Sequence, residues 1–332
     1  MSTPLVSIII PTANRPSLLP RAVDSALAGM AAHEVEVIVV PNGPDTSWQE
    51  SLSPYINHPS LRILPIAKQH ANAARNHGMR HARGKLIRFL DDDDKLYPSR
   101  AVQQYAALVQ SGNDLCSADI DLLDYEGHVF DNWLQDRRTD DFTESICSHH
   151  RMQQVTAHVF RLDMVSDVPW DESLPYSQDI CWLLDIVSRK DLKWTRLEIK
   201  VGGWHRHLEK RISTDASILQ ARVFVAERLR SVASALAESG RLSATRRVAI
   251  ADGIWEQIHE TFYLSPVYWW KMGRWADTFC PGSHPPIRMY EYPLITKLPF
   301  GPLVWEALTF PRRVARHAVK AAGYKLGFAR WW

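Results

Sequence analysis

The sequence lacks the features that mark several large classes of protein. Its four cysteines are widely spaced and form no Cys-x-x-Cys pair, which favours reduced thiols over a zinc site or a disulfide framework. No apolar run approaches the roughly 20 residues that a membrane-spanning helix needs. The formal net charge is only +2, so the composition gives no sign of nucleic-acid binding, and we expect no nucleic-acid partner.

Targeting and phosphate-binding motifs are missing as well. The start, "MSTPLVSIIIPTANR", has neither the basic beginning nor the small-residue cleavage site of a signal peptide, so we expect a cytoplasmic protein. No G-x-G-x-x-G follows the first apolar run, and no G-x-x-x-x-G-K-[ST] occurs anywhere. Neither a dinucleotide-binding fingerprint nor a P-loop is therefore present. With 45% hydrophobic and 23% charged residues, the 332-residue chain is typical of a folded protein.

Strand-like and helix-like segments alternate in the first third of the chain. Apolar, β-branched runs predict strands at 6–10, 35–40, 61–64 and 85–90. Helices are predicted at 17–30, 47–56, 69–82 and from Ser99, as N-cap, to Gly112, as the residue that ends the helix. This alternation predicts an α/β fold with a mainly parallel sheet flanked by helices.

Polar loops follow three of the predicted strands. They read "PTANR", "PNGPD" and, after the fourth strand, the four successive aspartates Asp91 to Asp94. Ligands bind beyond the carboxyl ends of parallel strands, so we expect these loops to converge on one cleft. Adjacent carboxylates suit a hard divalent cation, Mg²⁺ or Mn²⁺, which leaves part of its coordination shell to substrate phosphates. The alternative is a solvated turn after a strand.

Four separated segments resemble the family 2 glycosyltransferases, which have the Rossmann-like GT-A fold. They are "VSIIIPTANR", "VIVVPNGPD", "ANAARNHGMRHARGKLIRFLDDDDKLYP" and "WDESLPYSQDICWLLDI". The resemblance implies a GT-A domain over 1–213, with a nucleotide-sugar half at about 1–112 and an acceptor half at about 113–213. We expect 214–332 to form a mainly helical, aromatic-rich C-terminal region.

The resemblance also implies a donor site. Asp91 and Asp93 match the family's Asp-x-Asp signature, with Asp93 the more direct metal ligand and Asp91 nearer the ribose or a metal-bound water. His207 is implied as a further metal ligand or a phosphate contact. The implied contacts to a nucleoside-diphosphate sugar are Pro11, Thr12, Asn14, Arg15, Asn42, Arg75, Asp91 and Asp92. A UDP-sugar is favoured, although an amide at Asn42, where the family often has a carboxylate, leaves thymine and guanine open. For Arg75, the alternative is a cation on the helix surface paired with a carboxylate.

A catalytic base is implied by "WDESLPYSQDICWLLDI", which resembles a family segment ending in Glu-Asp. By that match Asp179 is the base, Gln178 replaces the Glu, and Trp182 packs beside the acceptor. One base with direct displacement implies inversion at the anomeric carbon. The alternative for Asp179 is a carboxylate that stabilises the start of a helix capped by Ser177.

The C-terminal end of the chain is basic. No acidic residue follows Glu306, whereas six basic residues do: Arg312, Arg313, Arg316, Lys320, Lys325 and Arg330. An apolar stripe of Val314, Ala318, Ala322 and Leu326 and the terminal Trp331 and Trp332 complete a basic amphipathic helix. Such a helix predicts peripheral contact with the inner face of the cytoplasmic membrane. Packing on its own domain and a dimer contact are the alternatives.

Together, these features predict an inverting, metal-dependent glycosyltransferase. It would move a sugar from a nucleoside-diphosphate sugar to a hydroxyl of a glycan or lipid-linked glycan, in cell-surface polysaccharide synthesis. Two alternatives remain: a sugar-nucleotide nucleotidyltransferase, and a non-catalytic module that binds nucleotide sugars or membranes.

Overall fold

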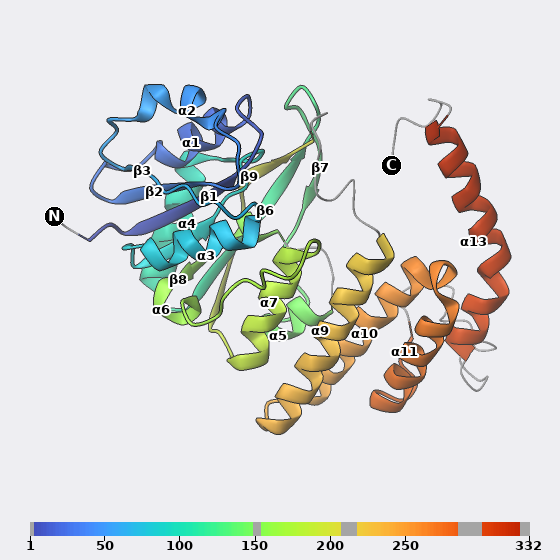
Figure 1. The fold of residues 1–332 in the computed structure, drawn as a ribbon. Coiled ribbons are helices and arrows are strands. Elements are labelled where there is room, and N and C mark those ends of the chain that lie inside the picture. The colour runs from blue at the N-terminus through green and yellow to red at the C-terminus, as the bar shows by residue number, and fades with distance from the viewer. Residues whose placement is uncertain (1–2, 149–153, 207–217, 285–300, 326–332) are drawn as a thin grey trace. The chain divides into compact units, whose positions relative to one another are not determined.

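The computed structural model describes residues 3–148, 154–206, 218–284 and 301–325 (Figure 1). The chain divides into two compact units. The first consists of Met1–Ile146 with His150–Asp215, and the second of Cys147–His149 with Ala216–Trp332. None of the described helices is both long and apolar enough to cross a bilayer.

A mixed sheet of nine strands forms the centre of the first unit (Figure 1). Its order is β3-β2-β1-β4-β8-β6-β9-β5, and β7 pairs with β6. The strands are β1 (Val6–Thr12), β2 (Val35–Pro41), β3 (Leu61–Ile63), β4 (Leu86–Phe89), β5 (Lys95–Leu96), β6 (Leu115–Leu123), β7 (Val129–Trp133), β8 (His158–Arg161) and β9 (Trp194–His205).

The predicted parallel arrangement lies in one half of this sheet. β3, β2, β1 and β4 are parallel neighbours, and every residue of β1 is buried, as expected from its nearly continuous apolar character. Beyond β4 the sheet is mixed: β8 runs antiparallel to both β4 and β6, while β9 runs parallel to β6. The α/β fold class is confirmed: the strands that precede the acidic loop are all parallel, and the strands that follow it are mixed.

Helices flank this sheet in the first unit. They are α1 (Leu19–Leu27), α2 (Trp48–Ser51), η1 (Ser53–Tyr55), α3 (Ala71–His81), α4 (Pro98–Ser111), α5 (Phe142–Cys147), η2 (Val155–Ala157), α6 (Leu162–Val165) and α7 (Gln178–Arg189). Ser99 was wrongly predicted as an N-cap, because α4 already begins at Pro98, a residue favoured at the first helical position. Gly112 ends α4 in the left-handed conformation, φ 64°, as predicted.

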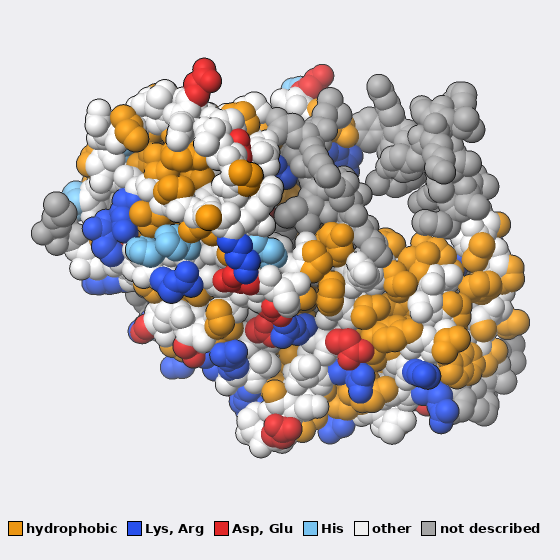
Figure 2. All heavy atoms as spheres, viewed as in Figure 1, with side chains coloured by type: hydrophobic (Ala, Val, Ile, Leu, Met, Phe, Trp, Pro, Cys, Tyr) orange, Lys and Arg blue, Asp and Glu red, His pale blue; other side chains and the backbone are white. Residues whose placement is uncertain are grey.

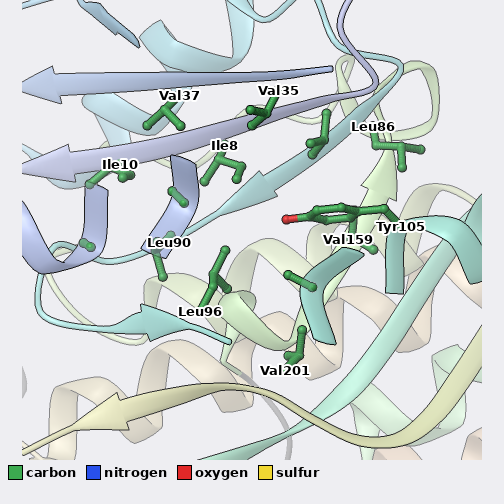
Figure 3. Packing of buried hydrophobic residues seen from close by; sticks show 14 of the residues in the cluster. Ile8, Ile10, Val35, Val37, Leu86, Leu90, Leu96, Tyr105, Val159 and Val201 are labelled. Atoms are coloured by element: carbon green, nitrogen blue, oxygen red, sulfur yellow. The ribbon is translucent and has the colours of Figure 1, made fainter. Parts of the chain in front are cut away.

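Buried aliphatic side chains between the sheet and its helices hold the strand ends in place. Figure 3 shows Ile8 and Ile10 of β1 beside Val35 and Val37 of β2. These side chains are almost completely withdrawn from water, and burying each stabilises the fold by roughly 1.5–3 kcal/mol. The ends of β1 and β2, from which the polar loops begin, are therefore held in place by the core.

Trp182 belongs to this buried framework, so its predicted place beside the acceptor is wrong. Its indole is 1% exposed and stacks on Trp170 with the ring centroids 4.4 Å apart. Its Nε1 donates a hydrogen bond of 2.9 Å to the carbonyl of Val168. The apolar face of α7 carries Trp182 inward, because side chains three and four residues apart share one side of a helix.

The second unit is helical in its described part. It contains α9 (Ile218–Glu238), α10 (Ala244–Thr261), η3 (Phe262–Leu264), α11 (Pro266–Phe279) and α13 (Gly301–Lys325). The first half of α13 packs on its own unit: Leu303 is fully buried against Gly273, where an added Cβ would lie 2.4 Å from Leu303 Cδ2. For this half of α13, the alternative of packing on its own domain holds.

A buried ion pair between Glu306 and Arg313 also lies on α13. The carboxylate of Glu306 is fully buried and accepts hydrogen bonds from Arg313 at 2.6 Å, with His259 Nδ1 2.7 Å away. Arg313, predicted to lie on a basic outer face, is therefore turned toward its own unit, because the Glu306 carboxylate needs a cation when it is buried. Leu326, Arg330 and the terminal tryptophans lie outside the described residues.

Candidate active site

The loops after β1, β2 and β4 meet at one edge of the sheet, as predicted. β1 pairs in parallel with β2 on one side and with β4 on the other, so the carboxyl ends of all three strands point the same way. The backbone N–H and the Nδ2 of Asn42 both donate to the carbonyl of Thr12, at 3.0 and 2.8 Å. The first two loops are thus bonded directly to each other.

The shape of these two loops depends on left-handed backbone. Asn14 has φ 57°, a conformation that asparagine tolerates better than most residues, and its N–H donates to Asp45 Oδ2 at 2.8 Å. Gly43 has φ 90°, and a Cβ there would lie 2.8 Å from Gln69 Cβ. The loop after β2 therefore requires glycine at this position.

The four aspartates form a tight turn with basic neighbours. The backbone N–H of Asp94 donates to the carbonyl of Asp91 at 3.1 Å. Arg15 Nη1 contacts Asp92 Oδ1 at 2.7 Å and Asp93 Oδ2 at 2.8 Å, and Arg21 donates to the carbonyl of Asp93. Carboxylate oxygens of Asp91, Asp93 and Asp94 lie within 4.8 Å of one another. The turn gathers three ligand oxygens of the kind that Mg²⁺ and Mn²⁺ prefer.

Burial changes the acid–base behaviour of this loop. Withdrawal from water raises the pKa of Asp92 to about 7; Arg15 opposes the rise and Asp93 adds to it. Burial alone would lower the pKa of the Arg15 guanidinium, but Asp92 and Asp93 hold it above its ordinary value. Arg15 thus acts as the cation that keeps adjacent carboxylates together.

Arg75 links the acidic loop to α7. Its Nη2 donates to Asp91 Oδ1 at 2.7 Å and lies 3.8 Å from Asp179 Oδ1, and its guanidinium stacks 4.6 Å from the ring centroid of Trp170. The side chain is 5% exposed, so it is a buried cation and not one on the helix surface. Its described charged contacts are to Asp91 of the acidic loop and to Asp179.

The geometry explains why an amide stands at Gln178. Its Oε1 accepts from Arg75 Nη1 at 2.9 Å, and its Nε2 donates to the carbonyl of Leu174 at 3.0 Å. A glutamate here would place a carboxylate oxygen against that carbonyl and lose the second hydrogen bond. Gln178 therefore orients Arg75 without adding a negative charge.

Asp179 lies in the first turn of α7, two residues after Ser177 at the N-cap position, and faces the acidic loop. Its Oδ2 accepts from the N–H of Val155 at 3.2 Å. Burial raises its pKa to about 6; Arg75 opposes the rise, and the charge of Asp91 adds to it. A carboxyl group with a pKa of about 6 is mostly ionised at neutral pH and still basic enough to accept a proton, which suits general-base work.

β9 also contacts the acidic loop. The N–H of His205 donates to Asp94 Oδ1 at 3.1 Å, and Lys95 of β5 pairs with Gly203 of β9. The sequence left Asp94 open and did not single out His205, since their contact depends on pairing between distant strands. His207, predicted as a metal ligand, lies outside the described residues.

Comparisons with known proteins agree with this arrangement. The family model described as "Glycosyl transferase family 2" matches residues 7–163. An uncharacterized glycosyltransferase of Rickettsia bellii is 31% identical over 37% of this chain and 18% of its own length. The chondroitin synthase of Escherichia coli is 32% identical over 45% of this chain and 22% of its own length. The chain therefore spans well under half the length of these two relatives.

The fold has a solved counterpart. Residues 1–349 of TarS from S. aureus, solved in complex with UDP-GlcNAc, match with a TM-score of 0.66 at 15% sequence identity, over 83% of this chain and 82% of that one. At 15% identity the likeness to TarS supports the fold alone. The family model supports the resemblance of residues 7–163, which contain the acidic loop. Residues 7–163 of the chain are therefore similar to glycosyl transferase family 2, and the chain has the GT-A fold.

Proposed function

We propose that this protein is an inverting glycosyltransferase that uses Mg²⁺ or Mn²⁺ and a nucleoside-diphosphate sugar. The observation that carries the proposal is the set of three carboxylates within 4.8 Å, facing the half-buried Asp179 across Arg75. The acceptor is a hydroxyl of a glycan or lipid-linked glycan in cell-surface polysaccharide synthesis, a role supported by the chondroitin synthase among the relatives.

The charges of the site fit a divalent cation. Five carboxylates, of Asp179 and the aspartates from Asp91 to Asp94, lie with three guanidinium groups, of Arg15, Arg21 and Arg75. When all are ionised, two negative charges remain, which one divalent ion balances. The donor set, oxygen only, suits Mg²⁺ or Mn²⁺ better than a softer metal.

Asp93 and Asp91 are the proposed ligands of the metal ion. Asp94 is added to them because its carboxylate oxygen lies within 4.8 Å of theirs. When bound, the ion supplies a Lewis acid that stabilises charge on the leaving diphosphate. Asp92 is held by Arg15 inside the loop, so we assign it the task of shaping the metal site beside the nucleotide.

The loops after β1 and β2 are proposed to hold the nucleotide. Asn42 Nδ2 donates a hydrogen bond to the carbonyl of Thr12. This bond leaves Asn42 Oδ1 as the acceptor for the ring N–H of a uracil. Asn14, with Pro11 and Thr12, offers backbone and side-chain groups along the same edge. Arg15 contributes by holding the acidic loop. UDP is the favoured nucleotide, supported by the fold shared with TarS, which was solved with UDP-GlcNAc.

Asp179 is the proposed catalytic base. Its carboxylate would accept the proton of the acceptor hydroxyl as that oxygen attacks the anomeric carbon, so the configuration inverts in one displacement. Arg75 holds Asp91 and lies near Asp179 from a buried position, and therefore fixes the spacing between the metal site and the base.

A donor panel tests this function. Thermal unfolding is measured with UDP-, GDP-, dTDP- and CMP-sugars, each with and without Mn²⁺, for the wild type, Asp93→Ala and Asp179→Asn. A bound donor at a hundredfold excess over its Kd stabilises by about 2.7 kcal/mol. We expect one nucleotide class to act only with metal and Asp93, and Asp179→Asn to keep this binding while transfer falls about 10²–10⁴-fold. An unchanged transfer rate in Asp179→Asn would contradict its role, and a metal-independent response would contradict the metal site.

We also propose that the second unit attaches the protein peripherally to the inner face of the cytoplasmic membrane. Hydrophobic side chains gather over the helices of this unit in Figure 2, and the side chains of Val267 and Leu308 are 72% and 70% exposed. Exposed apolar patches of this kind mark interaction sites. The Val267→Asp, Leu308→Asp double variant should lose sedimentation with anionic vesicles, whereas Val129→Asp, at an exposed position of the first unit, should keep it. Equal sedimentation of both variants would argue against this surface.

A further inference from the structure

A row of residues crosses the sheet directly beside the acidic loop. Asp121 of β6 pairs with Gly203 of β9, and Gly203 pairs in turn with Lys95 of β5, so the three residues lie side by side on neighbouring strands. Lys95 is the residue that follows Asp94 in the chain. The row spans two strand spacings, about 10 Å, and therefore extends from the end of the acidic loop to Asp121.

The side chain of Tyr97 joins the two ends of this row. Its hydroxyl donates to Asp121 Oδ2 at 3.0 Å, and Lys95 Nζ lies 5.8 Å from the centroid of its ring. It passes over Gly203, where an added Cβ would lie 3.4 Å from the Tyr97 hydroxyl oxygen and 2.4 Å from Leu123 Cδ1. Lys95, Tyr97 and Asp121, the polar strip, thus bring together an ammonium group, a phenol and a carboxylate.

The polar strip lies on the face of the sheet that carries the proposed base. Side chains alternate along a strand, and the residues of β6 that belong to the core shared with α1 and α4 are Cys116, Ala118 and Ile120. Asp121 therefore lies on the opposite face together with Leu115, which pairs with Phe160 of β8. The ring of Phe160 packs on Trp182 of α7, with the centroids 5.4 Å apart. The same helix carries Asp179 in its first turn, so Asp121 and Asp179 share one face.

Asp179 also lies at the same end of the sheet as Asp121. β8 runs antiparallel to β6, and its first residue, His158, pairs with Ser117. The chain therefore enters β8 from the end toward which β6 runs, where Asp121 is found. Val155 belongs to the η2 turn that leads into β8 and contacts β6, and its N–H donates to Asp179 Oδ2 at 3.2 Å. A molecule bound to the polar strip would accordingly lie beside the proposed base.

The polar strip is accessible to a ligand. Lys95, Tyr97 and Asp121 are each partly exposed, whereas Leu96, between the first two, is buried in the core, as Figure 3 shows. Tyr97 uses one carboxylate oxygen of Asp121. In the part of the chain that the structure describes, no donor bonds to the other oxygen, Oδ1, and no carboxylate pairs with Lys95. One strong acceptor and one strong donor are therefore left for a ligand.

We propose that the polar strip is a subsite for the acceptor, and that the acceptor it takes is an uncharged sugar ring. This inference rests on the proposed function and names the class of substrate on its acceptor side. A hydroxyl group both donates and accepts, so one ring hydroxyl donates to Asp121 Oδ1 and a neighbouring one accepts from Lys95 Nζ. Tyr97 is a positioning residue that orients the carboxylate. A carboxylate on the sugar would meet the charge of Asp121, which disfavours an anionic ring.

Acceptor kinetics test the subsite. Transfer is measured from the nucleotide sugar that stabilises the wild type to the methyl glycosides of glucose, galactose, N-acetylglucosamine and glucuronic acid. The variants are Asp121→Asn and, as the matched control, Asp131→Asn. Asp131 is exposed on β7 and pairs with Leu122, so it lies on the opposite face from Asp121.

Asparagine at position 121 keeps an oxygen for Tyr97 but turns a donor toward the sugar. We expect Asp121→Asn to raise the acceptor KM about 10–100-fold, the loss of a hydrogen bond to a charged group, while kcat and donor binding stay unchanged. Asp131→Asn should behave like the wild type. Tyr97→Phe should raise the acceptor KM less than Asp121→Asn does and also leave kcat unchanged.

Donor binding separates a failure of this inference from a failure of the proposed function. With a wild type that binds the donor, an acceptor KM in Asp121→Asn equal to that of the wild type would overturn the subsite. Transfer to the glucuronide alone, or to none of the four glycosides, would overturn it as well. A wild type that binds no nucleotide sugar would instead overturn the proposed function, and this inference with it.

Discussion

Replacing Arg75 with methionine removes the cation that links the acidic loop to the proposed base. Methionine keeps most of the apolar contact with Trp170 but none of the hydrogen bonds to Asp91, Asn72 and Gln178, which measure 2.7, 3.0 and 2.9 Å. Breaking a fully buried pair costs about 3–5 kcal/mol. The carboxylates of Asp91 and Asp179 are 29% and 22% exposed and can take up water, which lowers the expected loss to about 2–3 kcal/mol.

For a unit of this size, that loss lowers the unfolding midpoint by roughly 4–12 °C. The assay is thermal unfolding in EDTA, repeated with saturating Mn²⁺. We expect Mn²⁺ to raise the midpoint more in Arg75→Met than in the wild type, because the ion replaces a missing positive charge beside Asp91. Arg80→Met is the control, since Arg80 lies on the same helix with its side chain exposed. Equal midpoints for the two variants, or an equal Mn²⁺ shift in Arg75→Met and the wild type, would refute the reasoning.

Three further tests address other parts of the molecule. If Asp179 is the base, kcat/KM should be independent of pH above the pKa of Asp179, about 6, and should fall tenfold per pH unit below it. The reason is that only the ionised carboxylate accepts a proton. A kcat/KM that does not fall at acidic pH would argue against the assignment. Glu306→Ala should destabilise the second unit by about 2–3 kcal/mol in chemical denaturation, since Arg313 loses its carboxylate partner but is 21% exposed and can take up water; the donor binding proposed for the first unit should stay unchanged. Gly78→Ala should cost about 1–3 kcal/mol, because its Cβ would lie 2.4 Å from Ile9 Cγ2, and a neutral or stabilising result would show that α3 moves away from β1 freely.

The parallel half of the sheet could be predicted from the sequence because its signals are local. β1, β2 and β4 are mainly apolar runs, and each is followed by a polar loop, so the local pattern predicted these strands and the acidic loop after β4. The mixed half of the sheet was harder to predict from the sequence, because the pairing of β6 with β9 joins segments that are far apart in the chain.

Other parts of the site required the three-dimensional structure. An aromatic residue near a proposed base can face either the substrate or the core, and Trp182 is in the core because Trp170 offers it a stacking partner. The place of Gln178 between Arg75 and the carbonyl of Leu174 is likewise invisible in a linear sequence. These contacts depend on how α7 lies on the sheet.

The hydrogen bond from the N–H of His205 to Asp94 has a consequence for the order in which the protein becomes competent. The two residues are separated by 111 positions, so the aspartates leave the ribosome long before the strand that completes their surroundings. A nascent chain that ends before β9 would carry every acidic side chain of the loop but not its final shape. Loop closure over such a separation is slow compared with local folding. The acidic loop should therefore reach its final shape only after β9 has been synthesised and paired.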